Sequence, residues 1–164
     1  MDPCFIADDL LDKLPTPAQV GKTKVGGIDH NQPRMRLVMQ ACTALAAAPT
    51  GFTASDLARK VGQLHPAKPF CYGPRQAAYD LKKLRGKEFM EKIGSSHRYQ
   101  PSNRGLRAMT GLVVLREKVI KPLLASCCQR KGGRKPRNTT PLEVRYQRLQ
   151  VDLQELFMEL GFAA

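Results

Sequence analysis

Tryptophan is absent from this 164-residue chain, and aromatic residues make up only 6% of it. Long apolar runs are absent too. The longest candidate, residues 37–52, is interrupted by a glutamine and a proline and is shorter than the roughly 20 apolar residues of a membrane-spanning helix. The first residues include three aspartates where a secretion signal would be basic and then apolar. We therefore expect a cytoplasmic protein that does not interact with a membrane.

Cysteines are few and form no recognisable pattern. There are five, an odd number, and no two are spaced as C-x-x-C. The odd number argues against a disulfide framework, which needs paired cysteines, and the missing C-x-x-C argues against a zinc knuckle. We expect a reducing compartment, no bound metal and no other cofactor for a chain whose cysteines are Cys4, Cys42, Cys71, Cys127 and Cys128.

Acidic residues are scarce over the middle of the chain, where paired carboxylates for acid–base catalysis are missing. Gly21-Lys22-Thr23 resembles the end of a phosphate-binding loop, but Thr16 stands where the first glycine of that motif is required. No nucleophile motif is present either. We therefore expect no enzymatic activity. The acidic residues within 33–141 are Asp56, Asp80, Glu88, Glu91 and Glu117.

Lysine and arginine are abundant and unevenly distributed. The chain carries 27 of them against 14 acidic residues, which gives a net charge of +13. Residues 33–141 hold 22 basic and five acidic residues, whereas residues 1–32 and 142–164 each hold two more acidic than basic residues. The positive field of this basic middle region attracts polyanions. DNA is the commonest cytoplasmic polyanion to bind a basic region flanked by ordinary helices. RNA, acidic proteins and anionic lipid stay open on charge alone.

Periodicity and capping residues predict a mainly helical middle with one β-hairpin. Prolines and glycines predict a loosely held arm over residues 1–32. Thr53 followed by Asp56 predicts a capping box for the second helix, and Gly62 is expected to end that helix. Apolar spacing predicts the other elements. We expect helices over residues 33–48 and 54–61, a short strand at 50–52, helices beginning at Pro74 and Asn103, and hairpin strands at 89–93 and 97–100.

The end of the chain separates into a basic linker and a helix with heptad spacing. Residues 127–139 combine positive charges with two glycines and a proline, which is typical of a linker. Residues 140–164 begin with a capping box, Thr140 and Glu143. The apolar seam of this helix is too short for a stable isolated coiled coil, so it must pack on the body or on a second copy. The seam consists of Leu142, Tyr146, Leu149, Leu153, Leu156 and Leu160.

The run Tyr79–Ile93, followed by Gly94–Tyr99, looks like the recognition helix and wing of winged helix-turn-helix proteins. It is similar to the MarR-like and ArsR-like bacterial regulators, and the whole layout is similar to a group of bacterial proteins with no assigned activity. The resemblance covers roughly residues 33–125. It implies a mainly α fold with a small β-hairpin (α+β), a winged-helix domain over 33–126 with a long fourth helix, and extra C-terminal helices. The matching positions are Leu81, Leu84, Phe89, Met90, Ile93 and Arg98.

Glu88 departs from this family pattern, because the family has a glycine there that adopts a positive φ at the end of the helix. Two explanations are open. Either Gly86 takes over that role with a shifted helix boundary, or Glu88 itself adopts the less favourable conformation.

The resemblance implies that the third helix enters the major groove of DNA. Arg75 and Gln76 at its start are expected to read base edges, because arginine pairs with guanine and glutamine with adenine through two hydrogen bonds. Tyr79 is expected either to contact a thymine methyl group or a phosphate, or to be half-buried in packing. The other expected DNA contacts come from this helix, the wing and the basic linker: Lys82 and Lys83; Lys92, His97 and Arg98; and Lys131, Arg134, Lys135 and Arg137.

These patterns favour sequence-specific or semi-specific binding of double-stranded DNA by a nucleoid-associated bacterial transcriptional regulator that acts by occupying its site. A homodimer formed through the C-terminal helix would read a pseudo-palindrome with half-sites about 10 base pairs apart. The alternative is a DNA- or RNA-binding accessory protein of a mobile-element or nucleic-acid processing complex. A protein-binding winged helix is disfavoured because the expected recognition face is basic.

Overall fold

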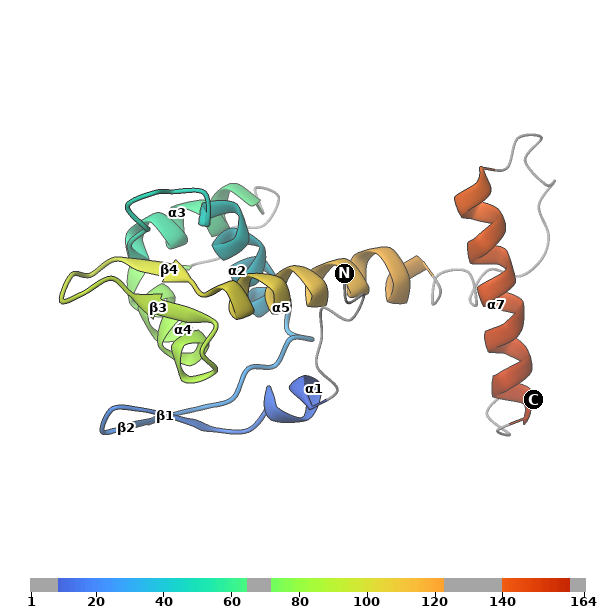
Figure 1. Cartoon of the computed structure of the whole chain (residues 1–164), viewed down its shortest axis with the longest axis horizontal. Helices are drawn as coiled ribbons and strands as arrows, with labels where there is room; N and C mark the ends of the chain where they lie inside the picture. Colours follow the sequence, from blue (N-terminus) through green and yellow to red (C-terminus); the bar gives the residue numbers. More distant parts are fainter. Residues whose placement is uncertain (1–8, 65–71, 123–139, 160–164) are drawn as a thin grey trace. The chain divides into compact units, whose positions relative to one another are not determined.

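The computed structural model describes residues 9–64, 72–122 and 140–159 (Figure 1). Contacts within the chain divide it into two units, one ending at Val113 and the other beginning at Val114. The division falls inside the helix that the sequence predicted to begin at Asn103. The buried residues of that helix all precede Val113, so only its first part packs on the first unit. The first unit therefore includes residues before 33 and ends before 126.

Three helices form the centre of the first unit. α3 (Ala54–Leu64) packs on both α2 (Pro33–Leu45) and α4 (Pro74–Gly86), and the apolar face of each helix points into one shared core. The fold class is confirmed as α+β, mainly helical with small antiparallel hairpins, but the described residues form two hairpins where the sequence indicated one. From residue 33 the elements are α2 (Pro33–Leu45), α3 (Ala54–Leu64), α4 (Pro74–Gly86), β3 (Met90–Lys92), β4 (Tyr99–Pro101) and α5 (Asn103–Val114).

Side-chain caps fix where two of these helices begin. The Thr53–Asp56 capping box is confirmed: the Thr53 N–H donates to the Asp56 carboxylate at 3.1 Å, and the Asp56 N–H donates to the Thr53 hydroxyl at 3.3 Å. The helix continues past Gly62, so the expected end there is wrong. α5 begins at Asn103 as expected, and its cap is Ser102, because the Ser102 hydroxyl accepts the Gly105 N–H at 2.9 Å.

The β3–β4 hairpin is joined to the core by backbone contacts on both sides. Met90 pairs with Pro101 and Lys92 with Tyr99. Phe52, in the turn before α3, exchanges two backbone hydrogen bonds with Tyr99 as an isolated β-bridge, so the strand expected over residues 50–52 is reduced to this one residue. A Cβ at Gly105 would lie 2.1 Å from the Phe89 carbonyl oxygen, so only glycine permits α5 to begin this close to the hairpin.

Glu88 resolves the question raised by the family pattern, because it has a φ of 61° while Gly86 stays helical. The Phe89 N–H donates to the Leu84 carbonyl at 2.9 Å, and the Glu88 N–H donates to the Arg85 carbonyl at 3.0 Å. These two bonds form a Schellman motif, with Glu88 at the position that glycine usually occupies. A non-glycine residue therefore carries the turn from α4 into the β3–β4 hairpin.

The expectation of a loosely held arm over residues 1–32 is wrong for residues 9–32. This segment forms α1 (Leu10–Lys13) and a hairpin of β1 (Ala18–Val20) and β2 (Thr23–Val25). Leu14 and Ile28 are fully buried in the core of the first unit, and the Ile28 N–H donates to the Leu14 carbonyl at 2.8 Å. The prolines and glycines indicated turns correctly, but apolar residues at both ends of the segment anchor it to the core.

In the second unit, η1 (Leu115–Ile120) is a π-helix and α7 (Pro141–Glu159) is a long α-helix. The predicted capping box at the start of α7 is confirmed, since the Thr140 N–H donates to the Glu143 carboxylate at 2.7 Å. The Tyr146 hydroxyl donates to the Lys118 carbonyl, which joins α7 to η1. The basic linker expected over residues 127–139 lies outside the described residues.

Replacing Glu88 with glycine is expected to raise the free energy of unfolding by about 1 kcal/mol, because glycine adopts a positive φ without the steric cost of a Cβ. The ion pair lost with it, to Arg104 at 3.5 Å, is exposed at both ends and contributes little. Urea unfolding measures the change. Glu88→Ala is the control, because it loses the same ion pair and keeps the Cβ. Equal stability of the glycine and alanine variants would show that the turn is unstrained.

Candidate nucleic-acid interface

The inner side of α4 follows the apolar spacing that the sequence predicted. Ala77, Leu81 and Leu84 are fully buried against α2 and α3. Arg75 and Gln76 near the start of the helix are exposed, as expected for residues that meet a ligand. The helix therefore separates a core side from a polar side.

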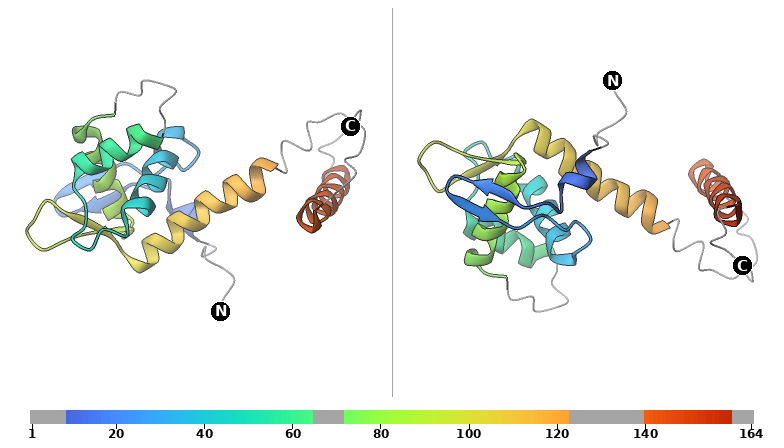
Figure 2. Two further views of the ribbon diagram at one scale, coloured as in Figure 1. Left: turned by 90° about the horizontal axis from the view of Figure 1, so that it is seen from above. Right: turned by 90° about the horizontal axis from the view of Figure 1, so that it is seen from below.

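Two hairpins flank α4. On one side Ala18, Val20 and Val25 of β1–β2 pack against Gly86, and on the other side β3 follows directly after the turn at Glu88. Figure 2 shows the β1–β2 hairpin lying along α4 in the view from below. On the side of α4 between the two hairpins, residues recur at i, i+3, i+7 and i+10, of which the first two are exposed and the last two half-buried. This α4 stripe consists of Arg75, Ala78, Lys82 and Arg85.

Tyr79 and Lys83 lie at the edge of α4 that the β1–β2 hairpin borders. A Cβ at Gly26 would be 3.8 Å from the Tyr79 hydroxyl and 3.8 Å from the Lys83 Cε. The Lys83 ammonium lies 5.1 Å from the centre of the Tyr79 ring, within the range of a cation–π contact. Tyr79 keeps 48% of its surface exposed. Lys83 is half-buried there, whereas Tyr79 stays exposed, so the hairpin borders Tyr79 without covering it.

The β3–β4 hairpin carries the three residues expected from the wing, in different settings. His97 is exposed near the tip, and Lys92 is half-buried on β3. The Arg98 guanidinium donates to the Gly51 carbonyl at 3.1 Å and to the Thr50 hydroxyl at 3.3 Å. Arg98 therefore supports the turn before α3, a structural contact that the sequence did not indicate.

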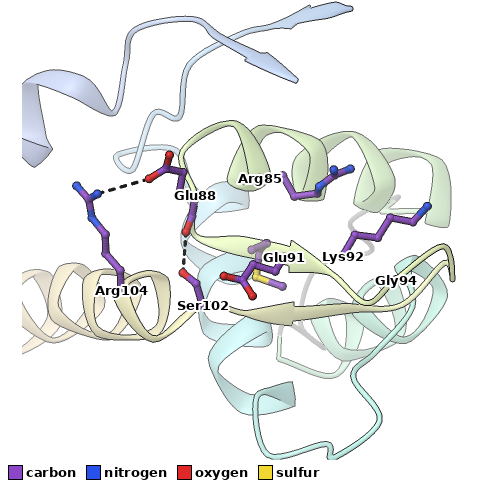
Figure 3. Close-up of a pocket in the computed structure, with 8 residues that line it drawn as sticks. Arg85, Glu88, Glu91, Lys92, Gly94, Ser102 and Arg104 are labelled. Atoms are coloured by element: carbon purple, nitrogen blue, oxygen red, sulfur yellow. Dashed lines mark hydrogen bonds and ion pairs between the residues drawn. The ribbon is translucent and has the colours of Figure 1, made fainter. Parts of the chain in front are cut away.

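An open hollow of about 660 Å³ lies where α4, the β3–β4 hairpin and the start of α5 meet (Figure 3). Glu88 and Arg104 pair at one end of it. In Figure 3 the Arg85 and Lys92 side chains extend away from that pair in a common direction. Cations placed in this way can hold a phosphate of a nucleic-acid backbone. Arg85 was missed in the sequence, although its spacing of three residues from Lys82 places it on the same stripe.

Asp80 is a buried carboxylate on the inner side of α4, and it was also missed. It accepts a hydrogen bond from the Tyr72 hydroxyl at 3.0 Å and another from the Arg34 guanidinium at 3.3 Å. Burial raises the pKa of Asp80 above its usual value, while Arg34 and Tyr72 oppose that rise. The spacing to Ala77 and Leu84 could have revealed it, because Asp80 falls among the buried positions of the helix. The network ties α4 to α2 and to the residues just before α4.

The predicted seam of α7 exposes a row of leucines. Leu142, Leu149 and Leu156 keep 61%, 46% and 48% of their surfaces exposed, and Tyr146 and Leu153 are half-buried. The last seam residue, Leu160, lies outside the described residues, as do four residues of the expected basic linker: Lys131, Arg134, Lys135 and Arg137.

Asp80→Ala is expected to lower the free energy of unfolding by about 2–4 kcal/mol, because it leaves a buried hydroxyl and a partly buried guanidinium without their acceptor. Tyr72→Phe is the control for the single hydrogen bond and should cost about 1 kcal/mol. Chemical denaturation of both variants measures the difference. If the two variants lose equal stability, the carboxylate holds α4 through Tyr72 alone.

The same carboxylate gives a dependence on pH. Since its folded pKa is raised above 3.8, the unfolded chain releases this proton at lower pH than the folded chain does. The stabilisation from a protonated Asp80 is complete below pH 3.8 and is lost as pH rises through the folded pKa. Wild type should therefore lose stability relative to Asp80→Asn over that window, as measured by unfolding at a series of pH values. A difference independent of pH would contradict the raised pKa.

The described residues contain no group of three His, Cys, Asp or Glu side chains that could hold a metal ion, and none of their helices is long and apolar enough to cross a membrane. The basic residues of α4 and the two hairpins form the best-defined candidate site in the part of the chain that the structure describes. Comparison of the chain with protein-family models, with curated proteins and with solved structures gave no match.

Proposed function

We propose that this chain binds double-stranded DNA through a winged helix-turn-helix and regulates transcription by occupying its site. The observation that carries the proposal is the α4 stripe, where exposed Arg75 and half-buried Lys82 and Arg85 lie on the outer side of a helix whose opposite side is core. A helix that is firmly packed on one side and basic on the other suits insertion into a groove lined by phosphates.

The order of elements supports the winged-helix part of the proposal. α2, α3 and α4 pack together, and the antiparallel β3–β4 hairpin follows α4 directly. In a winged helix, α4 would be the recognition helix and β3–β4 the wing. The backbone pairing of Phe52 with Tyr99 supports the same assignment, because it joins the hairpin to the turn between α2 and α3.

Different residues of α4 are suited to different contacts. Arg75 and Gln76 are exposed in the first turn of the helix, where side chains reach base edges most deeply. Lys82 lies further along, and Arg85 lies beside Lys92 at the hollow, which suits both to contacts with backbone phosphates. Sequence discrimination is then assigned to the start of the helix, and electrostatic affinity to the rest of it.

Arg75→Ala is expected to weaken binding to a selected DNA site roughly ten- to a hundredfold, because a bidentate arginine–guanine contact is worth about 1–3 kcal/mol. Binding to random duplex DNA should change little. The measurement is fluorescence anisotropy with duplexes selected from a random pool and with random duplexes, each at two salt concentrations. Arg107→Ala is the matched control, since it removes one exposed arginine from α5.

Three results would change the interpretation. If Arg75→Ala and Arg107→Ala weaken selected-site binding equally, α4 is not the reading helix. If wild type binds duplexes but the pool yields no motif, the accessory role in a mobile-element or nucleic-acid processing complex is favoured over the regulator. If wild type binds hairpin RNA and not duplex DNA, the DNA proposal is wrong.

We also propose that α7 pairs with α7 of a second copy. Its apolar seam has heptad spacing, so the seams of two copies can pack together, and exposed leucines lie on that seam. Leu149→Ala together with Leu153→Ala should then convert a dimer into a monomer in sedimentation equilibrium. An unchanged mass with a lower melting temperature would show instead that the seam packs within one chain.

A further inference from the structure

The β1–β2 hairpin packs so closely on α4 that the helix has no space for a side chain at Gly86. A Cβ at Gly86 would lie 2.8 Å from the Ala18 Cβ, 3.2 Å from a Val20 methyl and 3.3 Å from a Val25 methyl. The apolar face of the hairpin therefore packs directly on the helix backbone. This places the hairpin beside the α4 stripe, on the side away from β3–β4 (Figure 2).

The base of the hairpin is anchored as well. The Lys87 ammonium, just after α4, donates to the Thr16 hydroxyl at 2.9 Å and to the Lys13 carbonyl. Leu14 and Ile28 precede and follow the hairpin and are both fully buried. Because base and middle are both held, the hairpin is positioned before any ligand binds, and a ligand would pay little ordering entropy to use it.

The outer face and tip of the hairpin are basic. Gln19 and Lys24 form a cross-strand pair on the face opposite the apolar residues, and Lys22 lies in the turn beside Gly21, whose φ is 59°. Lys22 and Lys24 are both exposed. Residues 13–28 contain no aspartate or glutamate, so no local carboxylate neutralises the two lysines. The N-terminal segment, acidic as a whole, thus presents a basic hairpin next to α4.

We propose that β1–β2 is a second DNA-contacting hairpin, in which Lys22 and Lys24 bind backbone phosphates of the duplex whose groove α4 enters. The proposal rests on the proposed function and adds a site to it. With β3–β4 on one side of the α4 stripe and β1–β2 on the other, a duplex on α4 meets a basic hairpin on each side. Phosphate contacts of this kind add affinity and fix orientation without reading sequence.

The test is the salt dependence of binding to a random duplex for full-length wild type and for Lys22→Ala combined with Lys24→Ala. Two lost phosphate contacts should reduce the slope of log Kd against log salt by about 1.8 and weaken binding roughly tenfold or more at low salt. The matched control is Lys118→Ala combined with Lys121→Ala, which removes two charges from η1 and the residue after it. Thermal unfolding should be unchanged in the hairpin variant, since both side chains are exposed.

A slope reduced in the hairpin variant and retained in the control supports the second contacting hairpin. Equal slopes in the two variants overturn it while leaving the DNA-binding proposal intact, because wild type still binds. Tighter binding by the hairpin variant also overturns it and shows that β1–β2 screens α4 from the duplex. If wild type binds no duplex at all, the proposed function fails, and this inference fails with it.

Discussion

The inner side of α4 is held by apolar packing around one buried carboxylate. Ala77, Leu81 and Leu84 fill the space toward α2 and α3, and Asp80 among them accepts hydrogen bonds from Arg34 and Tyr72. Apolar contacts alone specify the rotation of a helix about its axis weakly, because they are not directional. A buried carboxylate with two hydrogen-bond donors fixes that rotation and holds the neighbouring segments that carry the donors. The orientation of every outward residue of α4 depends on that arrangement.

Close backbone contacts then place the two hairpins against α4. Gly86 allows β1–β2 to lie on the helix, and Gly105 allows α5 to begin against Phe89, next to β3. Between them, Glu88 turns the chain at a positive φ with the hydrogen bonds of a Schellman motif. Each position demands a specific backbone geometry and little side-chain chemistry, so a substitution there would change the interface without touching a basic residue.

The sequence predicted what depends on local patterns. The start of α4 at Pro74, its buried face and the Thr53 cap follow from residues close together in the chain, and the structure agrees. The arm was mispredicted because its structure depends on distant partners: Leu14 and Ile28 are buried in the core that residues far along the chain build. Proline and glycine indicate turns but do not reveal whether the turned segment packs.

The candidate site was predicted to a similar extent. Arg75 and Gln76 are exposed, as expected from their spacing to the buried residues of α4, whereas Lys82 is half-buried. The hydrogen bonds of Arg98 to the turn at Thr50 and Gly51 were beyond reach, because they join residues far apart in sequence. The sequence also could not predict the surroundings of Lys83. It indicates an exposed side chain there, whereas in the structure the distant β1–β2 hairpin lies beside it.

The β1–β2 hairpin beside Lys83 limits which residues of α4 can contact DNA in the proposed function. The two hairpins flank the C-terminal half of α4, so in the proposed complex only its first turn would contact DNA bases. Arg75 and Gln76 in that turn can specify few base pairs. One copy would therefore bind with much electrostatic affinity and little discrimination. Selection of a defined site then requires a second copy, and this gives the exposed seam of α7 a role that the first unit cannot supply.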